Sequence, residues 1–223
     1  MTIRASGYHA AFALLKGLGL LAALAAAAQA AYVPRTDAQL FADYVKAPAY
    51  TKYLSDAING TEPPPLKAKC ARLDIAALDP PLVLVKAEFA QIGNNYPISV
   101  GRWVARVTLN RCGTKVVRRM FIEADPQTGT IHSQALLPGE FAGNLQLEHD
   151  APRIVLPPAM GAAKCNDWKS LWVLDTKLTR PSVAAGWSET WTMQACGRTV
   201  TADVIYTADS TGMNITAKNV KAH

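Results

Sequence analysis

Apolar and polar residues alternate with a period of two in the middle of the chain. Apolar side chains occupy every second position over residues 103–109, and residues 116–122 follow as a returning strand. This period is typical of half-buried strands. Cys112-Gly113 lies between them and predicts a hairpin turn, because glycine can adopt a positive φ. With further strands predicted at residues 82–89 and 130–136, the pattern indicates an antiparallel β-meander.

The same arrangement occurs a second time. Trp187 lies 84 residues after Trp103, and Cys196-Gly197 lies the same 84 residues after Cys112-Gly113. The correspondence continues without a gap to Asp125 in the first copy. We interpret it as an internal duplication. It predicts a second meander with strands at residues 171–178, 187–195, 200–206 and 213–217.

Residues 35–59 have a helical period instead. Leu40, Tyr44 and Val45 follow at helical spacing, Pro48 interrupts the pattern, and it resumes at Tyr50. The aromatic residues of this stripe are expected to pack on the core, although such a stripe could also form a face that binds a sugar or a protein. The Pro- and Gly-containing residues 137–163 predict a connection between the modules, with a short strand at residues 153–156.

The predicted fold class is therefore mainly β (α+β): two related antiparallel β-meander modules, each closed by a disulfide, with an N-terminal helical arm. The expected boundaries are a signal peptide at 1–30, the helical arm at 31–62, a first β module at 63–145, the connection at 146–163 and a second β module at 164–223.

The N-terminal thirty residues have the pattern of a secretory signal peptide. Arg4 and Lys16 are the only charges, and an apolar run over residues 17–28 ends in the small residues of Ala28-Gln29-Ala30. A membrane anchor is the alternative, but the run is shorter than the ~20 residues that a span needs. We therefore expect a periplasmic or secreted protein of a Gram-negative bacterium, without stable membrane insertion after cleavage.

The charge of the chain argues against one class of partner. Removing Arg4 and Lys16 lowers the formal net charge from +6 to +4. This mild excess is not the dense cationic surface of a nucleic-acid binder. No nucleic-acid partner is expected.

Four cysteines follow the predicted signal peptide, an arrangement typical of two disulfides. The duplication selects the pairing Cys70–Cys112 and Cys165–Cys196 among the three possibilities. Zinc is the weaker interpretation, because no Cys-x-x-Cys pair exists and the histidines match no ligand spacing. We expect no metal or other cofactor.

The duplicated tryptophans are predicted to be structural. Trp187 and Trp191 share one face of a strand, and Trp103 and Val107 occupy the equivalent places in the first copy. We expect all four side chains to be buried near the disulfide of their own module, and Val204 to lie on the core face of the second module. The alternative is that the tryptophans form a ligand platform.

Few residues have the pattern of a catalytic site. His132 and Ser133 are neighbours on a predicted strand and so point to opposite faces. Glu148, His149 and Asp150 form a polar cluster that we expect to be solvated loop surface. No catalytic residue is assigned.

Basic residues gather around the first Cys-Gly hairpin. Arg111, Lys115, Arg118 and Arg119 could bind an anion or an acidic partner. We favour the interpretation of a solvated basic edge that discourages strand-to-strand aggregation. In that case, Arg118→Ala should leave stability almost unchanged.

Each copy of the repeat resembles a motif of uncharacterised secreted or periplasmic proteins of Gram-negative bacteria. In this motif a Trp is followed by eight residues, Cys-Gly, a strand and then an Asp…Gly turn. The resemblance implies an exported, disulfide-closed hairpin and no catalytic residue. The expected function is non-catalytic binding of an unknown protein or envelope component. One alternative is an inhibitor or immunity-type protein against an extracellular hydrolase, and another is a hydrolase with an unrecognised site that uses His149.

Overall fold

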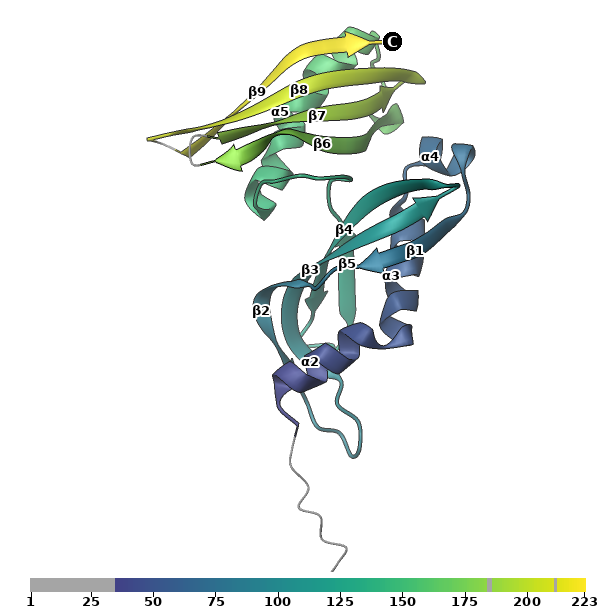
Figure 1. Ribbon diagram of the computed structural model, residues 1–223, viewed down its shortest axis with the longest axis vertical. Helices are drawn as coiled ribbons and strands as arrows, with labels where there is room; N and C mark the ends of the chain where they lie inside the picture. The colour runs from purple at the N-terminus through teal and green to yellow at the C-terminus, as the bar shows by residue number, and fades with distance from the viewer. Residues whose placement is uncertain (1–34, 184–185, 211) are drawn as a thin grey trace, which may run out of the picture. The chain divides into compact units, whose positions relative to one another are not determined.

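The computed structural model describes residues 35–183, 186–210 and 212–223 (Figure 1). Its contacts divide the chain into a unit Met1–Thr36 and a unit Asp37–His223, and all described helices and strands belong to the latter. The predicted signal peptide at residues 1–30 lies outside the described residues.

The first sheet is antiparallel and centred on one long hairpin. Two short strands lie one after the other along the same side of β3, where the sequence predicted a simple meander. Pro80-Pro81 separates them, because proline lacks the N–H that would continue a ladder. The strands are β1 (Leu73–Leu78), β2 (Leu82–Phe89), β3 (Ile98–Arg111), β4 (Thr114–Ala124) and β5 (Ile131–Ala135).

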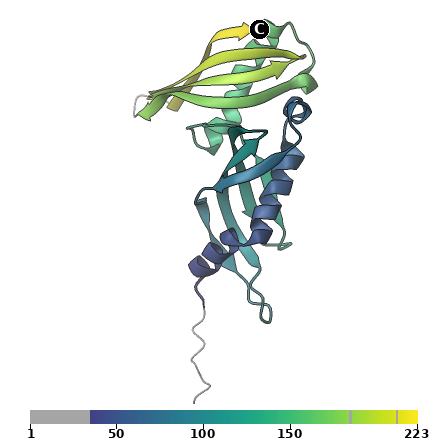
Figure 2. The same cartoon turned by 45° about the vertical axis from the view of Figure 1, so that its right-hand side comes forward.

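Three helices precede this sheet: α2 (Asp37–Lys46), α3 (Pro48–Thr61) and α4 (Pro64–Lys69). The first two lie in the predicted helical arm, whereas α4 lies in the range expected to begin the first β module. Figure 2 shows α3 lying along one face of the sheet. Tyr50, Leu54 and Ile58 of α3 are buried in the same core as Trp103. The Trp103 indole N–H donates to the Tyr50 hydroxyl at 2.9 Å, so the predicted packing of the aromatic stripe on the core is confirmed.

The second sheet is a continuous antiparallel meander, as predicted. Its strands follow one another in sequence order: β6 (Leu171–Val183), β7 (Gly186–Ala195), β8 (Arg198–Asp209) and β9 (Gly212–Ala222). A short 3-10 turn, η1 (Trp168–Ser170), leads into β6.

The connection contains a long helix, α5 (Leu145–Ala163), where a short strand at residues 153–156 was expected. That expectation is wrong because buried residues recur every four positions at Ala151, Val155, Ala159 and Ala163. This stripe packs against the second sheet. Three prolines lie inside the helix, away from the stripe, and the Asn144 side chain caps its first turn by accepting from Leu147 N–H at 2.9 Å. Each sheet is therefore preceded by helix and then by its first cysteine.

Both disulfides pair as predicted, Cys70–Cys112 and Cys165–Cys196. In each hairpin the two turn residues have positive φ, with 44° and 89° at Cys112 and Gly113. Positive φ at both central residues defines the type I′ turn, whose twist matches that of the flanking strands. Each disulfide therefore fixes the tip of a hairpin to the segment that enters its sheet.

The duplicated tryptophans are buried, as predicted: Trp103 and Trp191 are fully buried and Trp187 is 5% exposed. Val107 and Val204 are fully buried as well. Their expected position near the disulfides is wrong for Trp103 and Trp187. Each lies nine positions before the cysteine on an uninterrupted strand, about 30 Å along the chain at the usual strand rise.

Candidate functional site

The basic cluster of the first hairpin is largely buried. Arg118 is 6% exposed, and it donates from Nε to Glu62 Oε2 at 3.0 Å and from Nη2 to Oε1 at 2.8 Å. Arg111 contacts the same carboxylate and has a side chain only 10% exposed. The expected solvated basic edge is therefore wrong for these arginines, while Lys115 is exposed. Arg118 and Glu62 lie 56 positions apart in the sequence, so no local pattern predicted that they would form a pair.

Burial affects the protonation of this cluster. It lowers the pKa of both Arg111 and Arg118 to about 10. Burial also raises the pKa of Asp175 on β6, and the Arg118 charge opposes that rise. Arg111 and Arg118 thus lie close to Glu62 and Asp175. The two positive and two negative charges cancel, so this cluster would not attract an anionic ligand.

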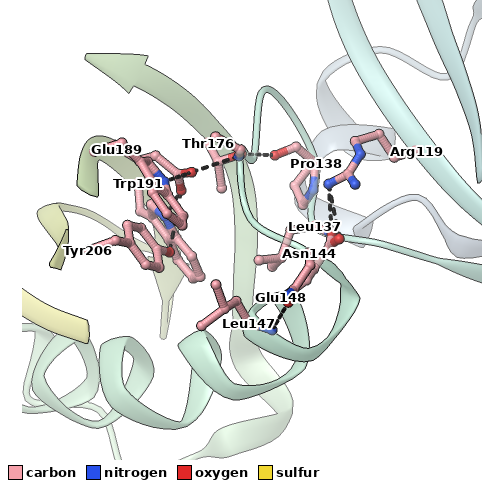
Figure 3. A network of polar contacts seen from close by, with 12 residues as sticks. Arg119, Leu137, Pro138, Asn144, Leu147, Glu148, Thr176, Glu189, Trp191 and Tyr206 are labelled. Atoms are coloured by element: carbon pink, nitrogen blue, oxygen red, sulfur yellow. Dashed lines mark hydrogen bonds and ion pairs between the residues drawn. The ribbon is translucent and has the colours of Figure 1, made fainter. Parts of the chain in front are cut away.

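Arg119, the fourth predicted patch residue, binds Glu148 of α5 (Figure 3). Arg119 Nη1 lies 3.1 and 3.0 Å from the two Glu148 oxygens, and Leu137 N–H donates to Oε1 at 2.6 Å. Burial raises the pKa of Glu148, and the Arg119 charge opposes this effect. Two donors, Arg119 Nη1 and Leu137 N–H, thus already contact the carboxylate, which is typical of a structural role.

A hollow of about 440 Å³ lies beside Glu148 and is lined in part by His149, Gln134 and Phe121. His149 is on α5 and not in a loop, but it is exposed as predicted. Its ring lies 3.2 Å from Asp150 and 3.5 Å from Arg153. The described residues place no serine, threonine or cysteine against this imidazole as a nucleophile, so the geometry favours no particular reaction here.

Glu189 on β7 is a fully buried carboxylate with four donors. It accepts from Trp187 Nε1, Trp191 Nε1 and Ala142 N–H at 2.9 Å each, and from the Tyr206 hydroxyl at 3.5 Å (Figure 3). Burial, and then the neighbouring Glu189, raise the pKa of Tyr206 beyond its usual range. The sequence analysis missed Glu189, although its place midway between two tryptophans predicted to share one face assigns it to that face.

These contacts hold the segment between the two sheets. Gly139 N–H donates to Val117 of β4 at 3.1 Å, and Thr176 of β6 donates from its backbone N–H to Pro138 O at 2.9 Å. A Cβ at Gly139 would lie 2.1 Å from Thr176 O, so only glycine fits. Together with the bonds to Glu148 and Glu189, this makes the connecting segment a fixed part of the fold. The buried charges are explained by this role.

Another hollow has a different character. It measures about 530 Å³ and lies between α2, the start of α3 and the β1–β2 junction, and we call it the α2 groove. Ligand pockets typically measure about 300–1,000 Å³ and are mostly apolar. Its lining is Ala38, Phe41, Ala42, Val45, Lys46, Tyr50, Thr51, Leu78, Asp79, Pro80, Pro81 and Ala105.

The polar residues that line the α2 groove are Lys46, Tyr50, Thr51 and Asp79. Asp79 is paired with Arg106, and both side chains are partly exposed. Lys46 is exposed and has no ion pair among the described residues. The Tyr50 hydroxyl already accepts from Trp103, and burial raises the pKa of Tyr50 to about 12. The groove therefore combines an apolar floor with one available cation.

The described residues contain no group of three or more His, Cys, Asp or Glu side chains placed to hold a metal ion. None of the helices in the same part of the chain has the length and apolar character needed to cross a bilayer. Comparison of the chain with models of protein families, curated protein sequences and solved structures finds no match. The α2 groove and its surroundings are therefore the candidate binding site.

Proposed function

We propose that the protein is an exported, non-catalytic binding protein whose ligand occupies the α2 groove. The observation that carries this proposal is an open apolar hollow of about 530 Å³ lined in part by Lys46, which has no ion pair in the described part of the chain. The buried charges of Arg118, Glu148 and Glu189 have partners that hold the fold together. A ligand with an apolar body and an anionic group complements this groove.

Export is supported by two features. The two disulfides are typical of an oxidising compartment. The N-terminal thirty residues have the signal-peptide pattern described above. We infer that the mature protein works in the periplasm or outside the cell, where its partner is a protein or an envelope component.

Titration with 1-anilinonaphthalene-8-sulfonate tests groove binding, because this probe joins an apolar ring system to a sulfonate. We expect saturable binding of one molecule per chain. Ala42→Trp should fill the groove and weaken binding by about tenfold or more, as lost apolar contacts predict. Ala49→Trp is the matched control, because Ala49 is an exposed helical alanine outside the groove lining. Equal binding by both variants would exclude the α2 groove as the site.

Two alternatives have separate tests. An inhibitor or immunity-type protein would capture one hydrolase stoichiometrically and abolish its turnover, and Ala42→Trp would show whether the groove is involved. A hydrolase would turn over at least one member of a broad substrate panel and lose this activity on His149→Ala. Turnover of that kind would replace the binding proposal.

A further inference from the structure

The outer side of β2 is a bare apolar edge. Leu82, Val83, Leu84 and Val85 are 61%, 45%, 43% and 39% exposed. Among the described strands, β2 pairs only with β3. Four consecutive residues of this strand therefore expose apolar surface. Soluble proteins usually protect such an edge, because its free N–H and C=O groups can pair with another chain.

The duplicated module provides an internal comparison. β6 is the corresponding edge strand, since it pairs with β7 as β1 and β2 pair with β3. Its sequence places Asp175, Lys177 and Arg180 along the edge. Charges of this kind discourage pairing with other strands. In β2 the first charge is Lys86, so residues 82–85 lack the charges that lie along β6.

The bare edge is continuous with the α2 groove. Pro80 and Pro81 line the groove and lead directly into Leu82. At the far end the edge is closed, because Phe89 N–H donates to the Asp37 side chain of α2 at 3.2 Å. The open part therefore covers residues 82–86, about 17 Å at the usual strand rise.

We propose that β2 accepts an extended apolar segment of another polypeptide as an added strand, with one of its side chains in the α2 groove. This inference rests on the proposed binding function and names its ligand class. In strand addition, main-chain hydrogen bonds supply affinity and pockets for alternate side chains supply specificity. The bare edge and the adjoining groove provide both elements.

Charge favours a partner segment that carries a carboxylate. Lys46 at the groove and Lys86 on β2 are exposed, and neither has an ion pair among the described residues. A second copy of this chain would bring its own Lys46 and Lys86 to the same region. A segment with an acidic side chain or a free C-terminus would instead complement both lysines.

A labelled octapeptide of alternating valine and serine with a free C-terminal carboxylate is the probe. Fluorescence anisotropy should show saturable binding to the wild-type protein. The same peptide with alternate backbone amides N-methylated should bind about tenfold more weakly or worse, because it keeps its side chains but cannot complete a ladder. Hydrogen exchange of the amides of residues 82–86 should slow when the unmodified peptide binds.

Variants separate the edge from the groove. Leu84→Lys should weaken peptide binding by about tenfold, because an edge lysine opposes strand addition. Thr216→Lys, on the exposed edge strand β9, is the matched control and should bind like wild type. Thermal unfolding of both variants checks that they are folded, and the exchange measurement on wild-type protein needs no substitution.

Three results would overturn strand addition. Equal binding of the N-methylated peptide would show recognition by side chains alone. Absence of peptide binding, with sulfonate probe binding still sensitive to Ala42→Trp, would refute strand addition and leave the proposed groove function intact. A wild-type dimer that Leu84→Lys converts to a monomer would identify a second copy as the occupant of the edge.

Discussion

Replacement of Arg118 by alanine should strongly destabilise the protein. The guanidinium makes two hydrogen bonds to Glu62, and the Glu62 side chain is only 1% exposed. Alanine removes the partner and leaves the carboxylate in a site that water hardly reaches. Breaking a buried ion pair from one side typically costs about 3–5 kcal/mol, because an uncompensated charge stays buried.

The lower end of that range applies here. Arg111 also contacts Glu62, so the carboxylate keeps one cationic neighbour after the substitution. A loss of about 3 kcal/mol is a substantial part of the ~5–15 kcal/mol that stabilises a typical protein. At about 2–4 °C per kcal/mol for a chain of this size, Tm should fall by about 6–12 °C.

Thermal unfolding of the oxidised, purified protein followed by circular dichroism measures this loss. Lys115→Ala on the same hairpin is the matched control, since Lys115 is exposed, and it should change stability by no more than about 0.5 kcal/mol. The double variant with Glu62→Ala should lose less than the two single losses added together, as expected for groups in contact. If Arg118→Ala has the same Tm as Lys115→Ala and the wild type, the buried pair does not stabilise the protein as expected.

Three further predictions concern other buried groups. Trp187→Ala should cost about 3–5 kcal/mol in thermal unfolding, and a variant that melts normally but loses a ligand would make Trp187 a binding platform. Glu189→Gln should cost about 1–3 kcal/mol in urea unfolding, because its amide N–H₂ would face donors. Burial raises the pKa of Tyr50 to about 12 and that of Tyr44 and Tyr206 further. The contribution of these tyrosines to stability is therefore fully present below pH 10 and is lost as the pH rises towards 12. Ultraviolet absorbance of tyrosinate measures their ionisation. Complete ionisation at an ordinary tyrosine pKa in the folded protein would contradict the prediction.

Local periodicity accounts for most of what the sequence predicts correctly. The period-two pattern around Trp103 and Trp187, and the constant spacing to Cys112 and Cys196, were sufficient to predict the hairpins and both disulfides. A duplicated unit constrains the pairing, because each copy must close on itself. These features depend on residues close in sequence or on the repeat.

The errors arise where distant residues or competing signals decide the outcome. α5 was missed because its prolines outweighed the four-residue stripe at Ala151 and Val155, although prolines on the exposed side leave that packing intact. Arg118 was assigned to a solvated edge because its partner Glu62 lies 56 positions away. The α2 groove is formed by helix and strand segments far apart in sequence, so no local pattern predicts it.

The two copies differ at one position on the core face of the central hairpin, and the difference accompanies a groove in the first module and a packed core in the second. Ala105 on β3 lines the α2 groove, and the 84-residue offset places Glu189 on β7 at the equivalent point. In the first module the methyl group leaves space beneath α2. In the second module a buried carboxylate and two indoles fill the equivalent layer, and their hydrogen bonds hold the connecting segment. The second module also has charges along its edge strand at Asp175 and Lys177, where the first part of β2, residues 82–85, has none. The groove and the uncharged edge residues thus both occur in the first module, so we assign the proposed binding role to that module. The buried carboxylate of the second module holds the connecting segment in place.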